Sequence, residues 1–408
     1  MPTPTLSTPL NDPVFADLHL HGWGSAYQTE LDKLGFPGNT SRDFSKHLLS
    51  VTLSESAGEA AMRLDVELHD NTRQHHPSFL TPLTVGTDLH LYGYGINYFL
   101  GGTRNEKPSR FFRGNVYKAR KSTRAGSRTR LYTAYDPATY LARTEAPLVY
   151  VDKTFTEIFK DVCAKYGFQY DDAIETTAKL GKIVMGPGWT LWRLFQECTK
   201  RTYDKTGLTY YVRSIPNKGR TINLRNFGDW EGEGKGITWR ITDGRQGTLL
   251  DHDIEDDAEH IATRIIITQE EYDDEGEFKA HKQIRQGIVI GGIREAFGDL
   301  LKILSPDSSL TPVYDEDDND WSQIDQQLTL QMEQALANYG RTRKKATLRN
   351  IYLPGLRRGD RITSGVAGTE MQHGWIVDAV ATTWEASGAT QTIEVVKHQS
   401  DSSVQVGG

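Results

Sequence analysis

One stretch of forty residues decides how this sequence is read: residues 129–168, TRLYTAYDPATYLARTEAPLVYVDKTFTEIFKDVCAKYGF. Within it, residues 131–135 alternate as on a half-buried strand. Asp136 and Pro137 come next and predict a helix start, because aspartate caps free amides and proline fits the first helical position. The stretch therefore begins with a strand that leads into a short helix.

A second, longer helix is predicted further along the same stretch, after the strand-like run 148–151. Thr154 and Glu157 have the spacing of a capping box, and Gly167 is a typical helix end. Apolar side chains recur on one face of this helix: Phe155, Ile158, Phe159 and Val162. We interpret the whole stretch as a structural joint and not as an active site.

The same residues resemble a known family. The run TAYDPATYLA and the helix pattern T-x-x-E-I-x-x-x-V-C-x-x-Y-G resemble the hub proteins of contractile phage tails and related prophage particles, of the XkdQ/YqbQ kind. Residues 353–362 add a second likeness, a proline–glycine turn leading into a strand that begins with Gly-Asp. The resemblance extends unevenly over residues 40–397. It implies a structural protein that forms a trimer between a six-fold tube and a three-fold spike.

Composition excludes several other classes of protein. The chain has 408 residues, a net charge of −7 and a mean hydropathy of −0.55. The negative charge argues against general nucleic-acid binding, and no run approaches the roughly 18 apolar residues of a membrane span. Cys163 and Cys198 are expected as small buried residues of a protein made in a reducing cytoplasm, although a disulfide between them stays open.

The order of patterns predicts a β-rich α+β fold. Short alternating strands separated by glycine, asparagine and proline occupy both ends of the chain. In the hub family two such blocks are β-barrels that resemble the tube subunit. We therefore expect two tube-protein-like β-barrel domains that flank a mixed α/β region. The expected parts are an extended N-terminal arm (1–13), a first barrel (14–128), the mixed α/β domain (129–236), a second barrel (237–398) and a polar tail (399–408).

The best helix of the C-terminal half is predicted at residues 322–343, where apolar residues recur at helical spacing. Lysine and arginine gather at its expected end, where the helix dipole favours them. We expect this helix to brace the second barrel and to bury Leu328, Met332 and Leu336.

Basic residues concentrate between residues 113 and 130. We interpret this stretch as a solvated hairpin or as an edge that faces an acidic partner chain. A nucleic-acid patch is disfavoured, because aromatic residues are not interleaved along the stretch as single-strand binders need for base stacking. The candidate assembly contacts are Arg113, Lys118, Arg120, Lys121, Arg124 and Arg128.

Patterns typical of enzymes are incomplete. His19 and His21 share a strand face, as in metal hydrolases, but the alternating strand–helix pattern of those enzymes is missing. Residues 315–320 open like a calcium loop, yet they lack its glycine and its closing glutamate. The acidic residues of 251–259 are interpreted as a solvent face. We assign no catalytic, metal-binding or cofactor-binding residue.

The predicted function is therefore that of a non-enzymatic baseplate hub. The expected partners are further copies of the chain in a homotrimer, the tail tube protein, the spike protein and other baseplate proteins, with no membrane and no specific nucleic acid. The expected location is the baseplate of a phage tail or phage-tail-like particle assembled in the bacterial cytoplasm. The alternative is a tail-associated hydrolase, acting on cell wall or using a metal at His19 and His21.

Overall fold

The computed structural model describes most of the chain between Leu18 and Gly407. The predicted N-terminal arm, the predicted domain boundary at 236 and the acidic run at 315–320 lie outside the described residues. Those described are 18–23, 42–43, 48–69, 83–93, 109–124, 127–215, 219–226, 239–241, 249–272, 278–289, 292–304, 321–351, 353, 355–364, 375–385, 388–397 and 406–407.

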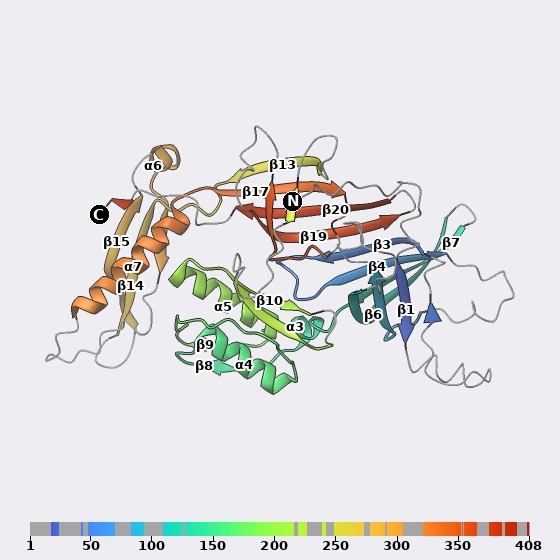
Figure 1. Ribbon diagram of the computed structural model, residues 1–408. Coiled ribbons are helices and arrows are strands. Elements are labelled where there is room, and N and C mark those ends of the chain that lie inside the picture. The colour runs from blue at the N-terminus through green and yellow to red at the C-terminus, as the bar shows by residue number, and fades with distance from the viewer. Residues whose placement is uncertain are drawn as a thin grey trace.

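One long sheet runs through the molecule (Figure 1). Eight strands follow one another in it, each antiparallel to the next: β13 (Leu249–Asp257), β17 (Arg343–Ile351), β20 (Gly388–Lys397), β19 (Trp375–Glu385), β3 (Leu48–Glu55), β4 (Arg63–His69), β7 (Ser127–Tyr135) and β6 (Ser109–Arg124). Five shorter strands extend it: β5 (Asp88–Gly93), β1 (His19–Trp23) and β2 (Arg42–Asp43) beyond the first half of β6, and β18 (Arg361–Ser364) with β12 (Trp239–Ile241) beside β19.

Strands β3 and β19 join the two ends of the chain into this one sheet. Val380 pairs with Glu55 at one end of the contact, and Glu385 pairs with Ser50 at the other. The predicted β-rich α+β class is confirmed. The strands expected to form two separate barrels instead share one open sheet in the described part of the chain.

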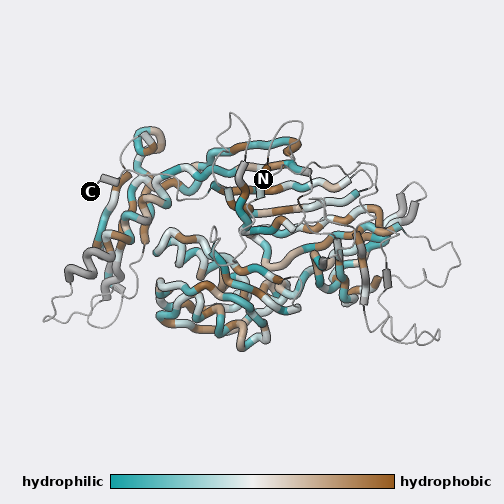
Figure 2. Tube along the Cα trace, viewed as in Figure 1, coloured by the Kyte–Doolittle hydropathy of each residue, from teal (hydrophilic) through white to brown (hydrophobic). Residues whose placement is uncertain are grey.

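The long sheet has a buried face and a polar face, because apolar and polar residues alternate along its strands (Figure 2). Two cores lie on the buried face. The first joins β3, β4, β6 and β7 to β1 and β5, and includes Leu20, Val51, Leu64, Leu91, Phe112 and Ala134. The second joins β17, β19 and β20 to β12 and β18, and includes Ile241, Leu348, Ile362, Trp375 and Ile393.

The middle of the chain forms the predicted helical unit, below the sheet in Figure 1. Helix α3 (Thr139–Arg143) follows β7, and helices α4 (Phe155–Tyr166) and α5 (Leu191–Thr206) pack on two small strand pairs, β8 (Val149–Tyr150) with β9 (Ile183–Val184) and β10 (Tyr210–Ser214) with β11 (Ile222–Asn226). The capping box of Thr154 with Glu157 and the left-handed end at Gly167 are confirmed. The predicted apolar face of α4 is buried.

The rest of the C-terminal part is a smaller sheet covered by one helix. Its strands are β16 (Leu301–Leu304), β14 (Arg264–Tyr272), β15 (Phe278–Val289) and β21 (Val406–Gly407), with the short helix α6 (Gly292–Phe297) beside them. Helix α7 (Trp321–Tyr339) lies on this sheet. The predicted burial of Leu328, Met332 and Leu336 is confirmed, and these side chains pack on β14 and β15. No helix among the described residues is long and apolar enough to cross a membrane.

The predicted end of α7 at Arg343 is wrong. The helix ends at Tyr339, and Gly340 follows it with its N–H bonded to the carbonyl of Leu336. The basic residues expected in the last helical turn begin β17, where Arg343, Lys344 and Lys345 face acidic residues of β13. Cross-strand charge pairing therefore accounts for these cations, and a helix dipole does not.

Candidate assembly site

The polar face of the long sheet is continuous across all eight strands. Strand register places its side chains on one side, and each of them is at least partly exposed. Hydrogen bonds between side chains connect neighbouring strands, with Thr52 and Thr383 3.1 Å apart and Asp65 2.7 Å from Thr133. The face includes Arg349, Thr392, Glu394, Thr383, Thr52, Arg63, Asp65, Thr133, Lys118 and Arg120.

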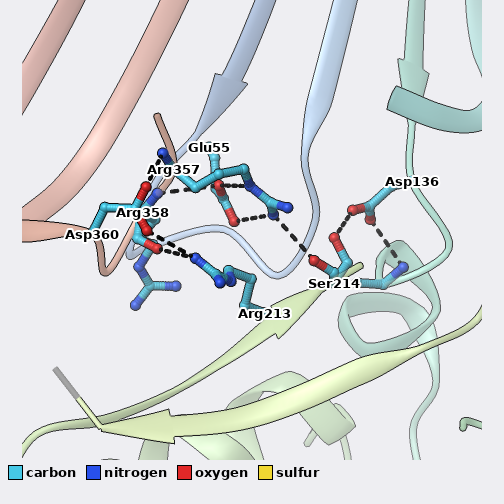
Figure 3. A network of polar contacts seen from close by, with 8 residues as sticks. Glu55, Asp136, Arg213, Ser214, Arg357, Arg358 and Asp360 are labelled. Carbon is cyan, nitrogen blue, oxygen red and sulfur yellow. Dashed lines mark hydrogen bonds and ion pairs between the residues drawn. The ribbon is translucent and has the colours of Figure 1, made fainter. Parts of the chain in front are cut away.

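On the buried side, a network of charged residues connects the sheet to the middle region (Figure 3). Glu55 ends β3, and both of its carboxylate oxygens accept hydrogen bonds of 2.9 Å from the guanidinium of Arg357. The backbone N–H of Arg358 donates to the same carboxylate at 3.3 Å. Burial raises the pKa of Glu55, but Arg357, with Arg213 and Arg358, outweighs that effect, and the pKa lies below its usual value.

The turn before β18 supplies the rest of this network. Asp360 accepts hydrogen bonds from the backbone N–H of Arg357 at 2.9 Å and from the Trp239 indole at 3.2 Å. Arg213 of β10 donates to the carbonyl of Arg358 at 3.0 Å and lies 3.4 Å from the Asp360 carboxylate. One turn therefore contacts β3, β10 and β12 together.

Gly359 is required in this turn for two reasons. Its φ is +85°, a left-handed conformation that side chains disfavour. A Cβ built there would also lie 1.9 Å from the hydroxyl oxygen of Tyr211 on β10. The Gly-Asp pair that carries part of the family resemblance thus allows the turn to approach the middle region closely.

Asp136 extends the network to the start of the helical unit. The predicted cap is wrong in position, because α3 starts at Thr139 with Ala138 as its N-cap and no side chain caps it. The Asp136 carboxylate instead accepts a 3.0 Å hydrogen bond from the N–H of Ala138 in the turn before the helix, and another from the hydroxyl of Ser214. The Ser214 carbonyl in turn accepts a 3.1 Å bond from Arg357. Complete burial raises the pKa of Asp136 to about 7. We call these residues the joint network: Glu55, Asp136, Arg213, Ser214, Arg357, Arg358 and Asp360.

The joint network unites both stretches that carry the family resemblance. Asp136 comes from residues 129–168 and Asp360 from residues 353–362, and Glu55 lies between them in space. Sequence reasoning missed Glu55, which ends an ordinary strand. The signal in the sequence that could have indicated a buried carboxylate partner is the Arg357-Arg358 pair, which lies in a turn that packs against apolar strands.

Five of the six candidate assembly contacts lie on β6, and Arg128 lies on β7. Arg113 is in the first half of β6 and pairs with Asp88 at 3.2 Å. The second half carries Lys118, Arg120 and Lys121, which are exposed. The side chains of Arg124 and Arg128 lie outside the described residues. The structure thus gathers the basic stretch on one hairpin.

The described part of the structure adds no residue to the catalytic or metal-binding site considered at His19 and His21. His19 and His21 lie on β1, paired antiparallel with β5, and their side chains are outside the described part. No group of three His, Cys, Asp or Glu suited to a metal occurs among the described residues.

Cys163 and Cys198 are buried free thiols, and burial raises the pKa of Cys163 to about 12. A groove of about 860 Å³ between α5 and β17 is lined by one carboxylate, that of Asp378.

Comparison with known proteins confirms the family resemblance. Residues 103–287 match the model of a family described as YQBQ-like, so this part of the chain is YqbQ-like. The match contains residues 129–168, on which the resemblance was based. No curated protein sequence matches the chain.

The fold is similar to that of two solved tail proteins. One is the 43 kDa tail protein of prophage MuSo2 from Shewanella oneidensis, with a TM-score of 0.57 and 12% identity over 93% of this chain and 98% of that chain. The other is a tail protein from Neisseria meningitidis MC58, with a TM-score of 0.58 and 12% identity over 93% of this chain and 96% of that chain. The chain thus has a phage-tail-protein fold along nearly its whole length.

Proposed function

We propose that the chain is a structural hub in the baseplate of a phage tail or contractile injection particle. It acts as a homotrimeric adaptor that joins the six-fold inner tube to the three-fold central spike. Two findings support a structural role: the YqbQ-like match of residues 103–287 and the fold shared with two phage tail proteins.

The organisation of the long sheet is the observation that carries this proposal. The β3–β19 contact divides the eight strands into two sets of four, β13-β17-β20-β19 and β3-β4-β7-β6. Each set has its own core on the same face of the sheet. Three copies therefore offer six similar four-stranded surfaces, the number that a six-fold tube needs.

In this proposal each four-stranded set, with the strands that cover its core, is the counterpart of one tube-protein-like barrel. The first counterpart lies within residues 14–128 except for β7, which runs into the middle domain 129–236, and the second lies within residues 237–398, together with most of the smaller sheet. The arm at 1–13 is left for contacts with neighbouring baseplate proteins, whereas the tail at 399–408 contributes β21 to the smaller sheet. The chain functions in the particle's baseplate after assembly in the bacterial cytoplasm.

The polar face fits the wall of a water-filled channel. Threonine hydroxyls and charges of both signs cover it, while apolar side chains point to the cores on the other side. A surface of this kind stays hydrated and does not favour association with apolar partners. We therefore assign the polar face to the lumen of the hub.

We propose no enzymatic activity. A hydrolase would need paired carboxylates, a nucleophile with its base, or a metal site, and the groove beside α5 is lined by one carboxylate and by no histidine, cysteine or serine. The alternative, a cell-wall or metal-dependent hydrolase using His19 and His21, predicts activity on purified cell wall that is lost in a His19→Ala/His21→Ala variant.

Mass measurement with and without tube and spike proteins tests the hub proposal. We expect three chains per particle, either alone or when these partners are added. A monomer or dimer under all conditions would contradict it, and so would hydrolysis of purified cell wall that depends on His19 and His21.

A further inference from the structure

The two outer strands of the eight-stranded sheet carry opposite charges, and this bears on how copies join. We propose that β13 of one copy pairs with the second half of β6 of the next copy, as an acidic edge against a basic edge. The inference rests on the proposed function for the number of copies in the ring. The edge contact itself is argued from the sheet alone.

The basic edge is the second half of β6. Among the described strands, β5 pairs with β6 from Ser109 to Asn115, and residues 118–124 pair with β7 only. This half is therefore an open edge beside its partner strand. Lys118, Arg120 and Lys121 are exposed there, and no ion pair joins them to a described acidic residue.

The acidic edge is β13, which pairs with β17 only among the described strands. Five of its nine residues are acidic. Asp256 and Asp257 form ion pairs with Lys344 and Lys345 of β17. The remaining three, Asp251, Asp253 and Glu255, are exposed and have no ion pair within the described part of the chain.

Strand direction permits the two edges to meet. The eight strands alternate in direction, so β13 and β6 run in opposite senses. If the strands run along the ring axis, rotation about that axis keeps their direction, and β13 of the next copy is then antiparallel to β6. The junction continues the alternation of the sheet and removes two open edges at once.

The charged side chains also lie on matching faces. Strand register places Lys118 and Arg120 on the polar face beside Thr133, and Asp251 and Asp253 on that same face beside β17. Side chains opposite each other on neighbouring strands interact directly. A contact between β6 of one copy and β13 of the next places cations opposite anions. A contact between two β6 strands or between two β13 strands would place like charges opposite each other. The charges thus favour head-to-tail closure.

Cross-linking tests the contact independently of ring size. Arg120→Cys and Asp253→Cys are introduced into one chain, and the assembled protein is treated with a flexible bis-maleimide. The native Cys163 and Cys198 are buried and should not react. We expect chain-to-chain cross-links in the double variant and none in either single variant. Absence of cross-links in a particle of three chains would overturn the edge contact and leave the hub proposal intact. Cross-links in a particle of another size would support the contact and contradict the hub.

Charge reversal gives a second, reversible test. Lys118→Glu/Arg120→Glu and Asp251→Lys/Asp253→Lys are each expected to raise the dissociation constant between copies about tenfold or more, and their combination should restore it. The control Lys179→Glu/Lys200→Glu makes the same change of charge at exposed sites of the middle region, on neither edge strand. Equal association of all four variants would overturn the inference, and so would failure of the combined variant to recover while the control associates normally.

Discussion

Replacing Glu55 with glutamine tests whether the joint network holds the sheet to the middle region. Glutamine keeps the shape of the side chain but removes its charge and one of its two acceptor oxygens. Both hydrogen bonds from Arg357 measure 2.9 Å, and the Glu55 side chain is 10% exposed. The variant therefore leaves a buried guanidinium facing an amide N–H₂.

The expected cost follows from this geometry. A hydrogen bond to a charged group contributes about 1.5 to 3 kcal/mol, and removing one partner of a buried ion pair costs about 3 to 5 kcal/mol. We expect Glu55→Gln to lose an amount in that second range near neutral pH. The pKa of Glu55 lies below its ordinary 4.5, so the contribution is present above about pH 4.5 and is lost as the pH falls through the lower folded value.

Urea unfolding followed by tryptophan fluorescence measures the loss, and Trp239 reports on the network because its indole bonds to Asp360. The matched control is Lys153→Gln, which removes a half-exposed ion pair to Glu157 of 2.9 Å. The control should change the free energy of unfolding by less than about 0.5 kcal/mol. A loss below about 1 kcal/mol for Glu55→Gln would refute the role assigned to the network.

Three further predictions concern stability. Because the folded pKa of Asp136 is about 7 against an ordinary 3.8, its contribution falls as pH rises, and the stability of the protein relative to Asp136→Asn should drop by roughly 2 to 3 kcal/mol between about pH 5 and pH 8; a flat difference would contradict the raised pKa. Gly359→Ala should cost more than about 2 kcal/mol, since its Cβ would overlap the facing tyrosine, while Gly355→Ala, with a φ of +86° and open space, should cost about 1 kcal/mol; equal losses in urea unfolding would show that the close approach is unimportant. Leu336→Asp should cost at least about 4 kcal/mol by placing a charge in the core under α7, whereas Leu330→Asp on the exposed side should cost less than about 0.5 kcal/mol; similar protease sensitivity of the two variants would mean that α7 does not brace its sheet.

Local structure was largely predictable from the sequence. The alternating run 131–135 lies in β7, and the capping box at Thr154 and the helix end at Gly167 lie where turn and capping chemistry puts them. These features depend on residues close together in the chain, so alternation and spacing are enough to find them.

Pairing between distant segments was not predictable in the same way. Thr52 and Thr383 are 331 positions apart, and alternation in either strand does not indicate its partner. The joint network was unpredictable for the same reason, because the partner of Glu55 is Arg357, which lies 302 positions away in the sequence. The predicted end of α7 was wrong for a related reason. The cations assigned to the last helical turn lie on β17, opposite acidic residues of β13 that are distant in the sequence.

Electron cryo-microscopy of the assembled chain, viewed end on, tests the central claim most directly. The account predicts a closed ring of three chains with six lobes of two alternating shapes, the polar face toward the lumen, and a sheet that continues from β6 of one copy to β13 of the next. A ring with three lobes only, or copies that meet through the middle region while both sheet edges stay free, would contradict it.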